Sequence, residues 1–212
     1  DVLAALRVLD VAHAVFLGHG VGALITLRVA VLAPRTVVGM CLCSAVATIQ
    51  PSSDWGLGSL EELKDTLQES LQDDTPDEQL WLAVERLCAA RDGGAGAELS
   101  RQSFEDVRAS APSTLRAMLR AAVGASIGAE DVRLVRGPVL LLRGAKDQWA
   151  TRAEHNALVL LFNGNKQVKV QTSEVQGAGH ALLWQLDKAA EVDAAIGRLL
   201  AQADEAAPLQ RP

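Results

Sequence analysis

Short apolar runs alternate with amphipathic segments at both ends of this chain, which predicts parallel strands separated by helices. Four runs are predicted as strands: 14–17, 36–43, 138–144 and 167–171. Three segments carry helical periodicity: 24–32, 152–162 and 187–203. The strand at 36–43 is apolar almost throughout, as expected of a strand that is buried on both faces of a sheet. The pattern therefore predicts an α/β fold with a doubly wound, mostly parallel sheet.

The middle of the chain has helical patterns and no predicted strand. Ser59 and Glu62 form a capping box, and Pro76 marks a second helix start. Helices inserted between two strands of a parallel sheet predict a cap over the carboxyl ends of the strands, where this class of fold places its pocket. The expected domains are a core of 1–45 and 135–203, a helical cap of 46–134 and a flexible tail of 204–212.

The first predicted strand ends in Gly18-His19-Gly20-Val21-Gly22 and leads directly into a helix. Strand, tight turn and helix form the geometry of a nucleophile elbow, G-x-S-x-G, in which the central serine stands on a strained turn above the sheet. Here Gly20 occupies the serine position. Serine on such a turn costs about 1–3 kcal/mol, whereas glycine adopts the same angles without a Cβ clash. The residues predict that the turn is kept and that the nucleophile is lost.

The same glycines allow a second interpretation. Gly18, Gly20 and Ala23 fit the dinucleotide fingerprint G-x-G-x-x-A. That fingerprint also needs an acidic residue about 20 positions further on, at the end of the next strand. The next strand runs into Ser44 and Ala45 without a carboxylate, so we expect no cofactor.

Two candidate acid–base residues follow later strands. Asp147 lies just past the run at 138–144, and His180 lies in the loop after the next strand. In an α/β-hydrolase triad the elbow comes first along the chain, then the acid, then the histidine. The acid orients the imidazole, and the histidine acts as base. An aspartate in a Gly-Ala-Lys-Asp turn also fits a simple turn residue. Four neighbours are predicted to line a pocket around the pair: His19, Val21, Trp149 and Trp184.

Charge and cysteine content limit which partners, disulfides and metal sites the chain can have. The 20 Lys and Arg against 26 Asp and Glu give a net charge of −6, which argues against nucleic acid or an anionic membrane as partner. No apolar run reaches the roughly 18 residues that span a bilayer. Cys41 and Cys43 share one strand face, and with Cys88 the count is odd, which favours buried thiols over a disulfide frame or a metal site. We expect a soluble, cytoplasmic protein that binds no metal.

The elbow, the helical insertion and the order of Asp147 and His180 resemble the α/β-hydrolase superfamily over nearly the whole length. Such folds have several strands before the elbow, so this chain, which opens on a helical pattern over 1–9, is expected to lack the N-terminal strands. Within the superfamily, the glycine at the nucleophile position resembles the N-myc downstream-regulated gene family and its plant relatives. The segments 53–55, 140–144 and 174–179 are also similar to that family.

That resemblance implies a non-catalytic binding, signalling or scaffold protein, whose partner would be a protein or a small apolar ligand under the cap. Asp147 and His180 depart from that family, because its members generally lack a recognisable triad. The pair keeps open an enzyme with a diverged nucleophile, either esterase-like or an oxygenase or lyase that uses only the His180 and Asp147 dyad. A third hypothesis is a structural subunit of a larger assembly. The sequence does not predict the oligomeric state.

Overall fold

The computed structural model describes residues 2–47, 76–82, 97–123, 126–147 and 150–206 of the 212-residue chain. In these parts, four strands form one sheet in the order β1-β2-β3-β4, and every neighbouring pair is parallel. The strands are β1 (Ala14–His19), β2 (Val37–Cys43), β3 (Val139–Gly144) and β4 (Val170–Val175). The predicted parallel α/β architecture is confirmed.

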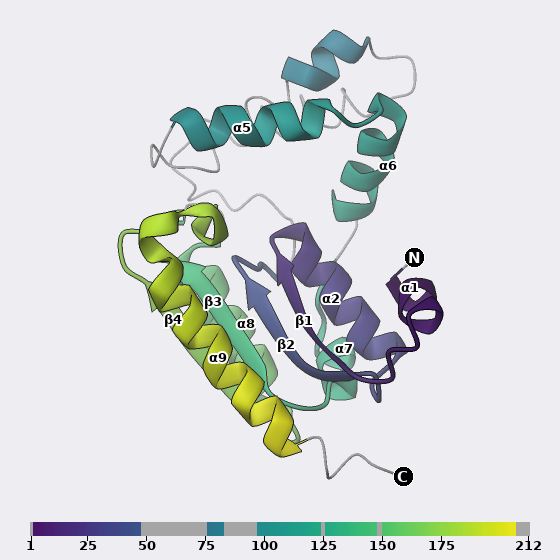
Figure 1. The fold of residues 1–212 in the computed structure, drawn as a ribbon, viewed down its shortest axis with the longest axis vertical. Helices are drawn as coiled ribbons and strands as arrows, with labels where there is room; N and C mark the ends of the chain where they lie inside the picture. Colours follow the sequence, from purple (N-terminus) through teal and green to yellow (C-terminus); the bar gives the residue numbers. More distant parts are fainter. Residues whose placement is uncertain (1, 48–75, 83–96, 124–125, 148–149, 207–212) are drawn as a thin grey trace.

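Helices cover both faces of this sheet (Figure 1). The labelled helices of the described parts are α1 (Val2–Val8), α2 (Val21–Leu32), α5 (Ala97–Arg108), α6 (Pro112–Val123), α7 (Ala129–Leu134), α8 (Arg152–Asn163) and α9 (Ala189–Ala206). Two short 3-10 helices, η1 (Leu182–Trp184) and η2 (Leu186–Lys188), precede α9. Helices α2, α7 and α8 share one apolar cluster with the sheet, and α9 shares another.

Strand β2 shows how the sheet divides the core. Met40 and Leu42 belong to the cluster on the side of α2, whereas Cys41 and Cys43 belong to the cluster on the side of α9. This follows from the alternation of side chains along a strand. Both cysteines are buried free thiols, as the sequence predicts. Burial raises the pKa of Cys41 to about 12, so this thiol is inert at neutral pH.

Strand β4 begins at Val170, later than the predicted 167–171 run. Asn165 accounts for the shift, because its side chain fixes a turn before the strand. Its Nδ2 donates to the carbonyls of Val132 and Val135, at 2.7 and 3.0 Å, and its Oδ1 accepts from the backbone N–H of Gln167. Residues up to Gln167 are thereby tied to the end of α7, and the ladder with β3 starts beyond them.

The last helix also differs from its predicted bounds of 187–203. The segment before it forms η1 and η2, in which the backbone N–H groups of Gln185 and Lys188 donate to carbonyls three residues earlier. Helix α9 then starts at Ala189 and continues to Ala206. Three residues assigned to the flexible tail, 204–206, are therefore helical, and 207–212 lie outside the described residues.

The inserted helices have a small apolar cluster of their own. Leu80, in the helical residues 77–82, packs with Leu115 of α6 and Phe104 of α5. Arg116 of α6 forms an ion pair with Asp77 at 2.9 Å. Figure 1 shows α5 and α6 beyond the carboxyl ends of the strands. The predicted capping box of Ser59 and Glu62 and the segment 53–55 lie outside the described residues.

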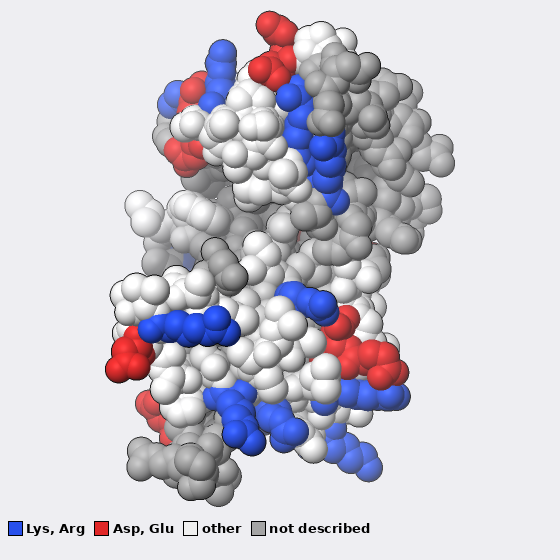
Figure 2. Space-filling model, turned by 90° about the vertical axis from the view of Figure 1, so that its right-hand side faces the viewer, with Lys and Arg blue, Asp and Glu red and all other residues white. Residues whose placement is uncertain are grey.

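The described surface carries both signs of charge. On the face drawn in Figure 2, basic and acidic side chains are interspersed among uncharged ones. None of the described helices combines the length and apolar character needed to cross a membrane.

Candidate functional site

The turn between β1 and α2 has the sharp geometry that the sequence predicts. Gly20 joins the two elements with φ 55° and ψ −118°. Its N–H donates to the carbonyl of Cys43 at the end of β2, at 2.9 Å, and its carbonyl accepts from Ala23 at 3.1 Å. A side chain at this φ is strained, whereas glycine is not. Gly20 therefore keeps an elbow that carries no reactive atom.

The other two glycines of the motif differ in what they do. A Cβ on Gly18 would lie 2.2 Å from the carbonyl oxygen of Gly22 and 2.4 Å from Oγ1 of Thr26. At Gly22 an added Cβ would meet nothing within 4 Å. Close packing of β1 against the first turn of α2 therefore requires glycine at 18, and the space at 22 would also accept alanine.

The structure brings Asp147 and His180 together. Asp147 follows β3, His180 lies in the loop after β4, and Nδ1 of His180 is 3.1 Å from each carboxylate oxygen of Asp147. The Asp147 side chain is fully buried, and that of His180 is 5% exposed. Because the strands are parallel and adjacent, their carboxyl ends bring two residues that are 33 positions apart into contact.

The carboxylate of Asp147 is stabilised in its ionised form. Burial raises the pKa of Asp147, but four interactions outweigh it: the hydrogen bond and the charge of His180, a hydrogen bond from the Ser44 side chain and one from the backbone N–H of Ala150. The net effect is a pKa below the ordinary value. Asp147 is therefore an acceptor for Nδ1–H, which fixes the tautomer that leaves a lone pair on Nε2.

The far edge of the His180 ring faces the vacated nucleophile position. A Cβ built on Gly20 would lie 3.4 Å from Nε2 of His180 and 3.9 Å from Cε1. His180 thus lies next to a turn that offers its ring no hydroxyl. The structure brings together the predicted elbow position, the acid and the histidine, and the elbow position carries no side chain.

Three rings in contact, those of His180, His19 and Trp184, extend from the buried His180 to the surface. His19 Nε2 donates to the backbone carbonyl of His180 at 2.8 Å, and the two rings are 4.8 Å apart. Trp184 contacts His19 edge-on, with ring centroids 5.0 Å apart, and is 56% exposed. Val21, the first residue of α2, is also exposed. Of the predicted pocket residues, Trp149 lies outside the described residues.

Ser44 is a site residue that the sequence interpretation missed. It is buried at the carboxyl end of β2 and has a positive φ of 49°, which is rare for a residue other than glycine. Its hydroxyl lies 3.2 Å from the carbonyl of His180 and also within hydrogen-bond reach of the Asp147 carboxylate, so its single proton serves one of the two acceptors at a time. The available signal was its place at the end of a buried parallel strand, at the edge of the sheet where sites of this fold class form.

No metal centre is found in the described parts of the chain: they hold no group of three or more histidine, cysteine, aspartate and glutamate side chains suited to an ion.

Comparison with known proteins places this geometry in context. A family model described as "Alpha/beta hydrolase family" matches residues 1–195. No curated protein matches the sequence significantly. Nothing in these comparisons bears on the narrower resemblance to the N-myc downstream-regulated gene family.

Three solved structures illustrate the fold. An enol-lactonase from Burkholderia xenovorans LB400 has a TM-score of 0.67 and 17% identity, over 95% of this chain and 70% of that chain. An esterase, RhEst1, from Rhodococcus sp. ECU1013 has a TM-score of 0.65 and 20% identity, over 94% and 70%. A bromoperoxidase from Bacillus anthracis has a TM-score of 0.67 and 16% identity, over 94% and 71%. At these identities the likeness is one of fold.

Proposed function

The chain belongs to the alpha/beta hydrolase family, and we propose that it is an enzyme in which His180, oriented by Asp147, is the general base and no serine takes part. The observation that carries this proposal is the buried Asp147–His180 pair, with Nε2 directed at the position that Gly20 leaves vacant. The fold neighbours include an esterase and an enol-lactonase, which supports small esters and lactones as the substrate class.

In this mechanism water replaces the serine hydroxyl. Nε2 of His180 accepts a proton from water as the water oxygen attacks the ester carbonyl carbon, and the carbonyl oxygen becomes an oxyanion. The intermediate then collapses, the bond to the leaving oxygen breaks, and the proton on Nε2 passes to that oxygen. The products are a carboxylic acid and an alcohol, or a hydroxy acid from a lactone. No covalent acyl-enzyme forms.

The start of α2 supports the developing negative charge. The helix begins at Val21, beside Gly20, so its positive dipole end lies at the reaction position. Dipoles that are already oriented toward a developing oxyanion are among the largest contributions to catalysis. Even without a serine, the elbow therefore contributes to the mechanism, because it holds this helix terminus next to His180.

The cost of burying Asp147 also favours a functional pair. A buried ion pair is weak evidence for stability, since apolar residues in its place are often neutral or stabilising. Here a fully buried carboxylate is kept together with a buried histidine and a strained serine that supports both. Strain and buried charge gathered at one point are typical of active sites.

The test is turnover of a panel of small activated esters and small lactones by purified protein. We expect hydrolysis of at least one member, with the intact protein mass unchanged during steady turnover because no acyl group is attached. The proposal fails if the whole panel is inert. A stable acyl adduct during turnover would contradict the water mechanism.

A second function, binding without catalysis, is favoured by Gly20 itself, because a residue that cannot act as a nucleophile occupies the nucleophile position. The resemblance to the N-myc downstream-regulated gene family implies such a role, with a protein or a small apolar ligand as partner. It predicts an inert parent protein in which Gly20→Ser gains ester turnover that requires His180. An active parent protein would rule out this second function.

A further inference from the structure

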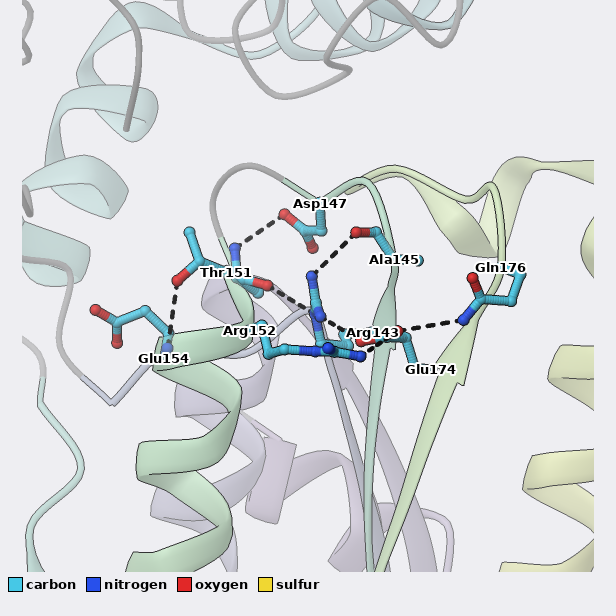
Figure 3. A network of polar contacts seen from close by, with 9 residues as sticks. Arg143, Ala145, Asp147, Thr151, Arg152, Glu154, Glu174 and Gln176 are labelled. Carbon is cyan, nitrogen blue, oxygen red and sulfur yellow. Dashed lines mark hydrogen bonds and ion pairs between the residues drawn. The ribbon is translucent and has the colours of Figure 1, made fainter. Parts of the chain in front are cut away.

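One guanidinium holds both ends of the loop that carries Asp147. Arg143 lies in β3, and its side chain is 4% exposed. Its Nε donates to the carbonyl of Ala150 at 3.0 Å, and its Nη2 donates to the carbonyl of Ala145 at 3.4 Å (Figure 3). These two carbonyls lie on either side of Asp147 in sequence. Arg143 therefore bridges the two sides of the acid loop, by which we mean residues 145–147 and 150.

The same loop is tied directly to Asp147. The N–H of Ala150 donates to Oδ1 of Asp147 at 2.9 Å, while the carbonyl of Ala150 accepts from Arg143. Ala150 is therefore held on one side by Arg143 and contacts the carboxylate on the other. Through this residue, a displacement of the guanidinium would move a hydrogen bond that helps to fix the acid.

The charge of Arg143 is already compensated elsewhere. Its register partner in β4 is Glu174, and Nη1 of Arg143 forms an ion pair with Oε2 of Glu174. Glu174 also pairs with the exposed Arg152 at 3.0 Å and accepts from Gln176 at 3.2 Å. Burial raises the pKa of Glu174, but these hydrogen bonds and the charges of both arginines outweigh it and lower the pKa.

In this arrangement the charge of residue 143 and the geometry of its side chain have different effects. A lysine at 143 would satisfy Glu174, but its single ammonium could not replace the rigid fork that reaches two carbonyls and a carboxylate at once. The residues that follow in the loop are also bound toward the segment that leads to His180, because Ala145 and Lys146 donate to the carbonyls of Val175 and Ala178. The acid loop and the histidine loop are thus connected through the residues that Arg143 anchors.

We propose that Arg143 is a positioning residue for the acid–base pair: its fork fixes Ala145 and Ala150 and, through Ala150, the carboxylate of Asp147 that orients His180. This inference rests on the proposed function, since the pair is what Arg143 would position. Arg143 contacts no reacting atom.

The test uses the proton on Nδ1 of His180, which gives a low-field nuclear magnetic resonance signal when it is held by a carboxylate. The signal is assigned by its absence from His180→Ala. In Arg143→Lys we expect it to shift or broaden, with kcat lowered about 10- to 100-fold and KM little changed, as small misplacements of reacting groups produce. The matched control is Arg152→Gln, which removes a cation from the same Glu174 without touching the acid loop and should leave the signal unchanged.

A second variant guards against misfolding of Arg143→Lys. Arg143→Met combined with Glu174→Gln removes the fork and leaves no buried unpaired charge, because Arg152, the other partner of Glu174, is exposed, and it too should lose the parent signal. If a folded variant of either kind keeps the signal and kcat of the parent, the positioning role is overturned. A parent protein without the signal would also overturn it. An inert parent that shows the signal, and loses it in these variants, would sink the enzymatic function while supporting the positioning role.

Discussion

A Cβ placed on Gly20 would lie 3.4 Å from Nε2 of His180. The base therefore faces the one position where the elbow has no side chain, and the acid behind it is fully buried. This relationship leads to the proposal that water, and not a serine, is the nucleophile. It also makes the consequences of several substitutions specific.

Gly20→Ser should add a hydroxyl within reach of His180. We expect a new or faster ester turnover that disappears when His180→Ala is added. Serine and alanine at this positive φ should each lower the free energy of unfolding by about 1–3 kcal/mol, so Gly20→Ala is the matched control for strain. Ester assays and urea unfolding check both effects. A gain of activity in Gly20→Ala would show that the hydroxyl is not responsible.

Gly18→Ala and Gly22→Ala should have opposite effects although both glycines belong to one motif. The added methyl at 18 would clash with backbone and with Thr26, and at 22 it would meet nothing within 4 Å. Overpacking costs typically about 1–3 kcal/mol, whereas alanine inside a helix is favoured over glycine by about 1 kcal/mol. Thermal midpoints of the two variants measure the difference, and equal midpoints would contradict the packing described for β1 and α2.

At Ser44, glycine should be a less destabilising substitution than alanine, the reverse of their usual order. Both substitutions remove the hydroxyl that donates to the His180 carbonyl, at about 0.5–1.5 kcal/mol for the lost hydrogen bond. Only glycine also relieves the positive φ of 49°, a conformation that costs a residue with a Cβ roughly 1–2 kcal/mol. We expect Ser44→Gly to be more stable than Ser44→Ala in urea unfolding. The reverse order would show that the backbone at 44 is not strained.

Acid should weaken the fold through Asp147. Its folded-state pKa lies below the ordinary 3.8, so the folded state binds fewer protons than the unfolded state near that pH. The stabilisation is therefore complete above about pH 4 and is lost as pH falls through the folded pKa. Urea unfolding of the parent should show this loss, and Asp147→Asn, which cannot titrate, should show a shallower dependence. Parallel curves for the two proteins would mean that the pKa of Asp147 is not lowered by folding.

Local patterns predicted the parts of this fold that depend on periodicity and backbone freedom. The apolar run of β2 predicted that both faces of this strand are buried, as Met40 and Cys41 are. The glycine spacing predicted the sharp turn at Gly20. The order of Asp147 and His180 along the chain indicated which loops could meet. These features follow from steric and hydrophobic rules that act over a few residues.

The remaining features depend on contacts between distant segments. Ser44 and His180 are 136 positions apart, and neither the strain nor the hydrogen bond at Ser44 has a local sequence signal. The sequence places Arg143 in the predicted strand 138–144 without a role of its own, because that role depends on the register that places Glu174 beside it. The shifted start of β4 likewise follows from side-chain bonds of Asn165 to α7.

The most direct measurement is kcat/KM for a small activated ester or lactone with the parent protein, His180→Ala and His13→Ala, where the control removes an exposed histidine that precedes β1. We expect His180→Ala to lower kcat/KM by about 100-fold or more, His13→Ala to stay close to the parent value, and all three proteins to stay folded. Equal turnover by the parent and His180→Ala would show that His180 is not the general base.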